Sequence, residues 1–332
     1  MGFTHHPIAL CTAALCVTFG AQLHAQSPAS AESIVLRKHI HGDAELTYRT
    51  VNGWDGKLDL YVPTDSGSHP LLIYFHGGGW EHGSKEMIVA NVTPYLEMGF
   101  AVANVEYRLA AAAPAPAAVE DARCAVRWLG QHAVKYHFDT ARFVLAGGSA
   151  GAHLALMAGM LRASDGLDGP CAGEPEPHIA AIINYYGITD VQDLIAGPHR
   201  THWAVEWIGA GPNSTELARR MSPLTYVRAG LPPIITVHGD KDKSVPYAQA
   251  VRLHEALDRV GVPNELVTVP GGGHANHDFS DAELVRVHRR IEAFLTAHHV
   301  WAPSQGADGS TTSSMHEPTT SHHSSSSSEQ LR

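Results

Sequence analysis

Hydrophobic positions along the chain fall into short runs that alternate with longer amphipathic stretches. Residues 57–62 alternate polar and apolar side chains with a period of two, which is typical of a strand with one buried face. Residues 71–75 and 100–105 are almost wholly apolar, as in strands that are buried on both faces. The pattern predicts further strands at residues 142–146, 179–184, 233–238 and 265–269.

Helices are predicted between these strands. The amphipathic stretches cover residues 85–98, 117–136, 153–158, 247–260 and 281–297, and Pro94 is expected to kink or shorten the first of them. Strands that alternate with helices predict an α/β fold with a mainly parallel sheet of about eight strands, flanked by helices. In such sheets ligands bind beyond the carboxyl ends of the strands, so side chains that follow a strand are the candidates for a functional site.

The beginning of the chain has the pattern of an export signal. Residues 8–21 form an apolar stretch of signal-peptide length that is too short to span a bilayer. Ala25 supplies the small residue that cleavage requires, and Ala31 offers an alternative. The segment before the apolar stretch is atypical, with His5 and His6 where Lys or Arg is expected. We expect a signal peptide at residues 1–25 and a secreted or periplasmic protein.

The end of the chain has a different composition. Residues 303–332 consist mainly of Ser, Thr, His and Gly, which bury too little apolar surface to offset the entropy of ordering. We expect a disordered tail there and one α/β domain over residues 32–301. Within that domain, residues 188–228 are expected to form a small helical lid insertion.

Charge and cysteine content narrow the function classes. The formal net charge of -10 excludes a nucleic-acid binder, because the chain has no basic stripe to neutralise phosphates. The histidines lack metal-ligand spacings, so neither a metal nor an organic cofactor is expected. Cys11 and Cys16 would leave with the signal peptide. Cys124 and Cys171 would remain, and in an oxidising compartment they could pair, the alternative being two unpaired buried thiols.

One motif suggests nucleophilic chemistry. Residues 147–151 read Gly-Gly-Ser-Ala-Gly and lie between a predicted strand and a predicted helix, which is the context of a Gly-x-Ser-x-Gly nucleophile elbow. A serine on such a turn is exposed, and the following helix directs N–H groups toward developing negative charge. The alternative is a glycine-rich loop without a role. The motif makes Ser149 a candidate nucleophile if the rest of the chain supplies its partners.

A nucleophilic serine needs a histidine to accept its proton and a carboxylate to orient that histidine. In this architecture the expected chain order is serine, acid, histidine. Asp240 and Asp242 follow one predicted strand, and His274 follows the next, so both order and placement fit. Spacing alone leaves open which of the two aspartates is the acid. His277 is a second candidate for the base, and we expect it at the rim of the site.

The same chemistry requires an oxyanion hole. Residues 76–80 read His-Gly-Gly-Gly-Trp directly after a predicted strand, where a backbone free of side chains can approach a substrate carbonyl. A plain glycine turn is the alternative. The expected donors are the N–H groups of Gly78, Gly79 and Ala150.

With these motifs, the chain resembles the α/β-hydrolase superfamily, specifically the His-Gly-Gly-Gly carboxylesterases related to bacterial acetyl and feruloyl esterases and, more distantly, to hormone-sensitive lipase. The resemblance covers most of the domain and lies in residues 58–63, 76–80, 83–85, 106–109, 116–121, 127–129, 147–154, 222–224 and 238–246. It implies an α/β-hydrolase fold, with Asp242 as the acid and His274 as the base. Gly148 stands where the hormone-sensitive-lipase group has Asp, and the region before Val51 is too short for that group's large cap. Both departures favour the feruloyl and acetyl esterase branch, which has a small lid.

Several residues outside the proposed triad and oxyanion hole are also expected to shape or support the site. Trp203 and Trp207 are four apart and share a helical face, so they form either the core of the lid or, with Trp80 and Tyr186, the walls of the substrate pocket. We expect a buried ion pair between Arg108 and Asp121 to support the oxyanion loop. We also expect His76 to hold the glycine loop and His153 to pack within its helix.

The sequence therefore predicts a secreted serine carboxylesterase that cleaves short-chain acyl or aryl esters of the acetyl or feruloyl type through an acyl-enzyme. Its substrate would be a small molecule or an ester linked to polysaccharide. An arylformamidase is the nearest alternative, because those enzymes resemble this chain in a His-Gly-Gly-x-Trp loop and in the pattern of residues 149–153. A prolyl-oligopeptidase type of peptidase would need a large propeller domain, for which the chain has no room. A catalytically silent hydrolase fold that only binds ligands is the third alternative.

Overall fold

The computed structural model describes residues 39–303 and arranges their strands in an eight-stranded sheet. The strands are β1 (Ile40–Val51), β2 (Trp54–Pro63), β3 (His69–Phe75), β4 (Ala101–Val105), β5 (Phe138–Gly148), β6 (Ile179–Tyr185), β7 (Ile234–Gly239) and β8 (Asn264–Val269). Their order across the sheet is β1-β2-β4-β3-β5-β6-β7-β8. β1 and β2 pair antiparallel at one edge, and all neighbours from β4 to β8 are parallel. The predicted mainly parallel sheet of eight strands is confirmed.

Helices connect the strands and cover the sheet. They are α1 (Val89–Met98), α2 (Ala117–Gln131), α3 (Ala150–Met160), α4 (Gln192–Ile195), α5 (His202–Ile208), α6 (Ser214–Arg220), α7 (Tyr247–Arg259) and α8 (Asp281–Ala297). Within residues 39–303 none of the helices has the length and apolar character needed to cross a bilayer. The signal peptide expected at residues 1–25 lies outside the described range, as does the expected tail beyond residue 303.

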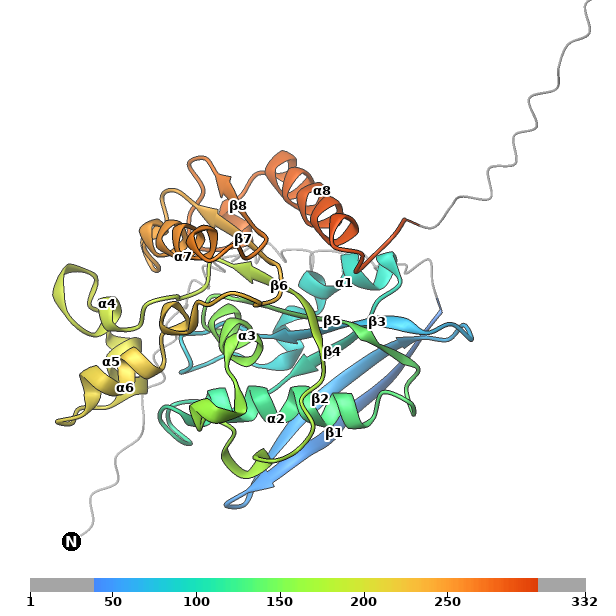
Figure 1. Cartoon of the computed structure of the whole chain (residues 1–332), viewed down its shortest axis with the longest axis horizontal. Helices are drawn as coiled ribbons and strands as arrows, with labels where there is room; N and C mark the ends of the chain where they lie inside the picture. The colour runs from blue at the N-terminus through green and yellow to red at the C-terminus, as the bar shows by residue number, and fades with distance from the viewer. Residues whose placement is uncertain (1–38, 304–332) are drawn as a thin grey trace, which may run out of the picture. The chain divides into compact units, whose positions relative to one another are not determined.

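The central strand β3 separates two hydrophobic cores. All seven of its residues are buried, and successive side chains point to opposite faces. Leu71, Ile73 and Phe75 join the core formed with α2, α3 and α7. Leu72 and Tyr74 join the core formed with α1 and α8. Figure 1 shows this division, with α1 and α8 on one side of the sheet and α2 and α3 on the other.

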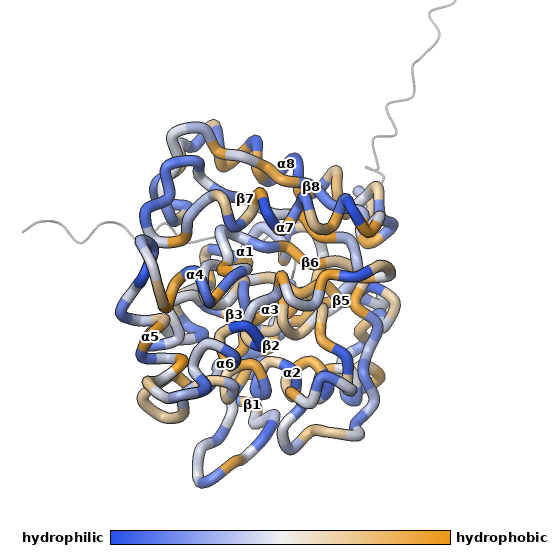
Figure 2. Tube along the Cα trace, turned by 60° about the vertical axis from the view of Figure 1, so that its left-hand side comes forward, coloured by the Kyte–Doolittle hydropathy of each residue, from blue (hydrophilic) through white to orange (hydrophobic). Residues whose placement is uncertain are grey.

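The distribution of hydropathy agrees with these layers. Figure 2 shows hydrophobic residues spread through the strands and the helices that cover them, whereas many of the outer loops are hydrophilic. A parallel sheet covered on both faces requires such strands, because neither face meets water.

Three elements differ from the sequence prediction. β1 was not predicted, because as an edge strand it is largely exposed and carries few apolar positions. Residues 85–88 form a 3₁₀ helix, so α1 begins at Val89, and it contains Pro94 and ends at Met98 as predicted. Burial of Val92, Tyr95 and Leu96 against the sheet compensates for the hydrogen bond that a proline cannot make.

The helix predicted to reach residue 136 ends earlier, at Gln131. Residues 132–137 form turns instead, and the N–H of Phe138 donates to the carbonyl of Ala133. This turn redirects the chain into β5, whose first residue is buried Phe138.

A disulfide joins Cys124 in α2 to Cys171, which ends a short 3₁₀ helix between α3 and β6. The two Cα atoms are 5.5 Å apart, and the bridge closes a loop with a sequence separation of 47 residues. It fastens the connection between α3 and β6 to a helix of the core. Such a cross-link stabilises the fold mainly by restricting the unfolded chain.

We predict that replacing both cysteines, Cys124→Ala with Cys171→Ala, lowers the free energy of unfolding by about 4 kcal/mol on the chain-entropy model. Guanidinium unfolding of the two proteins measures the difference. Alkylation of the unfolded, unreduced wild type is the control, since a disulfide leaves neither thiol to react. Alkylation of Cys124 and Cys171 in that control would contradict the pairing.

Candidate active site

Ser149 occupies a strained turn between β5 and α3. Its φ of 55° lies in the left-handed region, which is costly for a residue with a side chain. The turn is fixed by a hydrogen bond of 2.9 Å from the N–H of Ser149 to the carbonyl of Tyr185 in β6.

The glycines on either side of Ser149 allow two backbone segments to approach closely. A Cβ at Gly151 would lie 2.0 Å from the carbonyl oxygen of Phe75, and one at Gly147 would lie 2.4 Å from the carbonyl carbon of Gly151. Both distances are far below van der Waals contact. The elbow therefore requires glycine at these two positions because the end of β3 and the start of α3 leave no space for a side chain.

The structure brings Ser149, His274 and Asp242 together at the carboxyl ends of β5, β8 and β7. His274 Nε2 is 2.9 Å from Ser149 Oγ, and His274 Nδ1 is 2.8 Å from Asp242 Oδ2. The histidine thus contacts the hydroxyl with one ring nitrogen and the carboxylate with the other. This arrangement can remove the serine proton and stabilise the resulting imidazolium.

Asp242 is held by four donors. The N–H groups of Ser244 and Val245 donate to Oδ1, and the imidazoles of His238 and His274 both contact Oδ2. Burial opposes ionisation of this carboxyl, but the hydrogen bonds from the two histidines outweigh it and hold the pKa of Asp242 well below its usual range. The carboxylate is therefore charged throughout the neutral range.

The two other candidates lie elsewhere. Asp240 Oδ1 accepts a hydrogen bond of 2.8 Å from the N–H of Gly271 and so joins the loop after β7 to the loop after β8. His277 lines the edge of the cavity that contains Ser149, with a side chain that is 83% exposed, so it is a rim residue.

The glycine loop after β3 is shaped by its own backbone and by His76. His76 Nδ1 is 2.8 Å from the carbonyl oxygen of Gly77, and the imidazole stacks on the ring of Tyr107 at 4.3 Å. Gly78 has a φ of 120°, and a Cβ there would lie 1.9 Å from the carbonyl oxygen of His82. The loop therefore needs glycine at position 78 for both its conformation and its packing.

The expected oxyanion donors lie around Ser149. Gly78 and Gly79 line the same cavity as the serine hydroxyl. Ala150 is the first residue of α3, where an N–H group has no acceptor within the helix. These groups can donate to a negative oxygen that forms next to Ser149 Oγ.

The cavity in front of Ser149 has a volume of about 510 Å³. Its walls come from the end of β3, the glycine loop, the segment 85–91 at the start of α1, α5 and the loops after β6, β7 and β8. Besides Ser149 and His274, the lining side chains are Tyr74, His82, Met87, Asn91, Tyr186, Trp203, Ser244, Ala275 and His277. Tyr74, Met87 and Asn91 were not predicted. The pattern places Tyr74 inside a buried strand, and nothing in the local sequence indicates that residues 85–91 reach the site.

Two of the four predicted pocket residues line this cavity. The ring centre of Tyr186 is 5.1 Å from that of His274, and burial raises the pKa of Tyr186 to about 12, so the phenol is neutral. Trp203 packs over the glycine loop. A Cβ added at Gly79 would lie 3.2 Å from the Cβ of Trp203.

For Trp80 and Trp207 the prediction of a role as pocket walls is wrong. Both are fully buried and stack on each other at a ring distance of 3.9 Å, behind Trp203. His153 packs edge-on against both indoles, and its Nε2 is 2.6 Å from the carbonyl oxygen of Met221. This cluster joins the glycine loop to α5 and so supports the site from behind.

A buried ion pair supports the segment after β4. Arg108 Nε and Nη2 donate to the two carboxylate oxygens of Asp121 at 2.8 and 2.9 Å. Two residues later, the N–H of Ala110 donates to the carbonyl of Trp80. The ion pair is thus connected to the glycine loop through a short stretch of backbone.

One group in residues 39–303 has the composition of a cation site. Donor atoms of Glu81, His202 and Glu206 all lie within 4.8 Å of one another. The imidazole directs different nitrogens to the two carboxylates, at 3.4 and 3.5 Å, so the geometry is that of ion pairs rather than of a shared ligand position. None of the three residues lines the cavity at Ser149.

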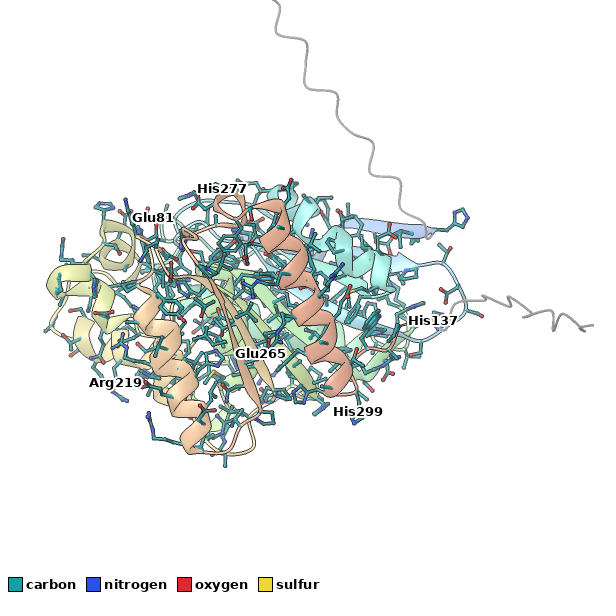
Figure 3. All side chains as sticks on the ribbon, turned by 90° about the horizontal axis from the view of Figure 1, so that it is seen from above. Glu81, His137, Arg219, Glu265, His277 and His299 are labelled. Atoms are coloured by element: carbon teal, nitrogen blue, oxygen red, sulfur yellow. A yellow bond between two sulfur atoms is a disulfide. The ribbon has the colours of Figure 1, made fainter. Side chains whose placement is uncertain are left out.

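Figure 3 places the site at one edge of the molecule. His277 and Glu81, which follow β8 and β3, lie along the same edge in this view, whereas Glu265 near the start of β8 and His299 after α8 lie toward the opposite edge. The site therefore lies at the carboxyl ends of the strands, where ligands of parallel sheets bind.

His238 is the residue of this site that the sequence reading missed as a functional residue. It is fully buried at the end of β7, and its Nε2 is 3.0 Å from Asp242 Oδ2. The sequence feature that could have indicated its role is its position, four residues before Asp242 and near the end of the strand that precedes this acid.

Comparisons with known proteins show the family of this chain. The profile of a family described as BD-FAE matches residues 58–257. The esterase LipQ of Mycobacterium tuberculosis is 28% identical over 230 residues, which are 68% of this chain and 53% of LipQ. The chain spans between half and two thirds of the length of the first curated relatives that it matches.

Solved structures show the same fold. The esterase Est2 of Thermogutta terrifontis is 26% identical, with a TM-score of 0.66 and coverage of 81% of this chain and 95% of that one. Est2 has also been solved with propionate and with butyrate bound. A truncated carbohydrate esterase from gut microbiota has a TM-score of 0.68 over 77% of this chain and 96% of its own, and its 24% identity supports the fold alone.

We predict that Gly151→Ala disrupts the elbow and lowers the melting temperature strongly, because its Cβ would collide with the backbone of Phe75. Gly148→Ala is the matched control, since a Cβ there meets only the side chain of Tyr186, at 3.2 Å. Thermal unfolding followed by circular dichroism compares the two variants. Equal melting temperatures would contradict the packing argument.

Proposed function

We propose that this chain, which belongs to the BD-FAE family of α/β-hydrolase-type esterases, is a serine carboxylesterase that cleaves short-chain acyl or aryl esters of the acetyl or feruloyl type. The observation that carries the proposal is the continuous path from Ser149 Oγ through His274 to Asp242 Oδ2, at 2.9 and 2.8 Å, in a cavity bordered by the glycine loop. A serine placed between a base and a set of oxyanion donors is the minimum machinery for acyl transfer.

Acylation begins when Ser149 Oγ attacks the ester carbonyl carbon and His274 Nε2 takes the hydroxyl proton. The carbonyl electrons move to the oxygen, and the N–H groups of Gly78, Gly79 and Ala150 stabilise this oxyanion. Ionised Asp242 stabilises the imidazolium. Collapse of the tetrahedral intermediate breaks the bond to the alcohol, which leaves with the proton from His274.

Deacylation repeats these steps with water as the nucleophile. His274 takes a proton from the water as it attacks the acyl-enzyme carbonyl, and the oxyanion forms again at the same donors. When the intermediate collapses, the proton passes to Ser149 Oγ and the carboxylic acid is released.

The cavity favours a small or flat acyl group. Its volume of about 510 Å³ is in the range of small-molecule sites, and the rings of Tyr74, Tyr186 and Trp203 border it. The similar esterase Est2 accommodates propionate and butyrate. An ester attached to a polysaccharide fragment fits the same proposal, with the sugar outside the cavity.

Secretion or a periplasmic location is also part of the proposal. The disulfide between Cys124 and Cys171 supports it, because such bridges persist mainly in oxidising compartments. The apolar stretch at residues 8–21 is the corresponding feature of the sequence.

Of the alternatives, arylformamidase activity rests on the His-Gly-Gly-x-Trp loop at residues 76–80 and on the pattern of residues 149–153. His153, the last residue of that pattern, is buried with the Trp80 and Trp207 rings and does not line the cavity. The pattern therefore adds no group that would select a formamide. A silent binding protein is disfavoured by the hydrogen bonds that connect Ser149, His274 and Asp242.

We predict that Ser149→Ala lowers kcat for p-nitrophenyl acetate by about a millionfold, because the nucleophile is lost. Asp242→Asn should lower kcat by roughly ten-thousandfold, because an amide favours the wrong tautomer of His274. Asp240→Asn is the matched control and should keep a kcat close to that of the wild type. A severe loss for Asp240→Asn together with an active Asp242→Asn would contradict the assignment of the acid.

We predict that kcat/KM is highest for acetyl to butyryl esters or for methyl ferulate, because the cavity limits the length of the acyl group. The test is a panel of p-nitrophenyl esters of increasing chain length, with methyl ferulate, acetylated xylan and N-formylkynurenine assayed alongside. Highest activity on long-chain esters, or turnover of N-formylkynurenine above that of every ester, would contradict the proposed substrate class.

A further inference from the structure

The carboxylate of Asp242 is shared by two histidines. His274 Nδ1 and His238 Nε2 contact the same oxygen, Oδ2, at 2.8 and 3.0 Å. The proposed mechanism uses only the first of these contacts. The second comes from a side chain that is fully buried and that does not line the cavity.

The acceptors around His238 fix the position of its proton. Its Nε2 is 3.0 Å from Asp242 Oδ2 and 3.1 Å from the carbonyl oxygen of Val245. Both neighbours are acceptors, so Nε2 must carry a hydrogen in order to contact them favourably. The single N–H of His238 is therefore shared between the carboxylate of Asp242 and the carbonyl of Val245, which lies in the same loop as Asp242.

The other ring nitrogen has no such neighbour. Among the described residues, His238 Nδ1 is buried and has no hydrogen-bond partner. A second N–H at that position would be left unsatisfied in the protein interior, which is costly. His238 is therefore the neutral Nε2–H form, and its chemistry is that of a fixed donor.

We infer that His238 is a positioning residue for the proposed hydrolysis, which holds Asp242 Oδ2 in place and offsets part of its charge through a neutral Nε2–H. This inference rests on the proposed function of the Ser149 site. Through Asp242, His238 sets both the orientation of His274 and the strength with which His274 holds a proton.

The groups around His238 show through which charged residue it can act on the site. Asp242, in the loop that follows β7, faces His238, and across that carboxylate lies His274. From α7, Tyr247 presents its ring at 5.7 Å, and the Tyr247 hydroxyl lies 2.5 Å from Thr268 Oγ1. Asp242 is thus the charged group in direct contact with His238 in the described part of the chain.

Two amide variants separate the roles of the two ring nitrogens. In His238→Gln the amide nitrogen can reach the position of Nε2, whereas in His238→Asn it reaches only the position of Nδ1. His238→Gln should keep kcat within about threefold of the wild type, and His238→Asn should lower kcat about tenfold with little change in KM. His254→Gln is the control for loss of a buried histidine far from the site, and it should keep wild-type kinetics.

The pH profile of kcat/KM gives the second readout. Without the His238 donor, Asp242 exerts its full negative charge on His274, which then stays protonated to higher pH. The acidic limb should therefore move up by about half a pH unit in His238→Asn and stay unmoved in His238→Gln.

Wild-type rates and pH profiles for both amide variants, or equal losses in both, would overturn the inference. A shifted acidic limb in His238→Gln would overturn it as well, because it would mean that His238 itself titrates. Each readout is a comparison with an active wild type. An inactive wild type with every ester would instead overturn the proposed function.

Discussion

The contact between the start of α3 and the end of β3 is the constraint on which the site depends. At Gly151 the two backbones are so close that a methyl group would lie 2.0 Å from the carbonyl oxygen of Phe75. Because of this contact, Ser149 projects from a turn with positive φ, directly beside the glycine loop that continues β3. The nucleophile and the oxyanion donors are thus placed relative to each other by backbone packing, which no side-chain rotation can alter.

The site also depends on a buried negative charge, the carboxylate of Asp242. Burial alone would favour a neutral carboxyl at Asp242, but two backbone N–H groups and two imidazoles bind its oxygens and keep it charged. Since all four donors are fixed by strand ends and by one tight loop, the charge needs no rearrangement during the reaction. Behind the glycine loop, Trp80 stacks on Trp207 of α5 and so fastens the loop to that helix.

Sequence reasoning was most successful where chemistry restricts the choice of residue. The serine, aspartate and histidine follow separate strands in a fixed order, and the glycine loop has few alternative explanations, so their proximity could be predicted. The resemblance to a family was needed to choose Asp242 over Asp240. Edge strand β1 could not be predicted, because an exposed edge leaves little hydrophobic pattern. Only two of the four predicted pocket residues line the cavity, since a tryptophan fits a buried stack as well as a cavity wall. His238 was missed because the role of a buried histidine depends on its neighbours in space.

Covalent labelling of Ser149 tests the central claim most directly. The full-length protein is incubated with a fluorophosphonate, digested and analysed by mass spectrometry. The account predicts one adduct for each chain, on the peptide that contains Ser149, and no adduct in Ser149→Ala. An unlabelled wild type, or an adduct that persists in Ser149→Ala, would contradict the claim that this serine is an activated nucleophile.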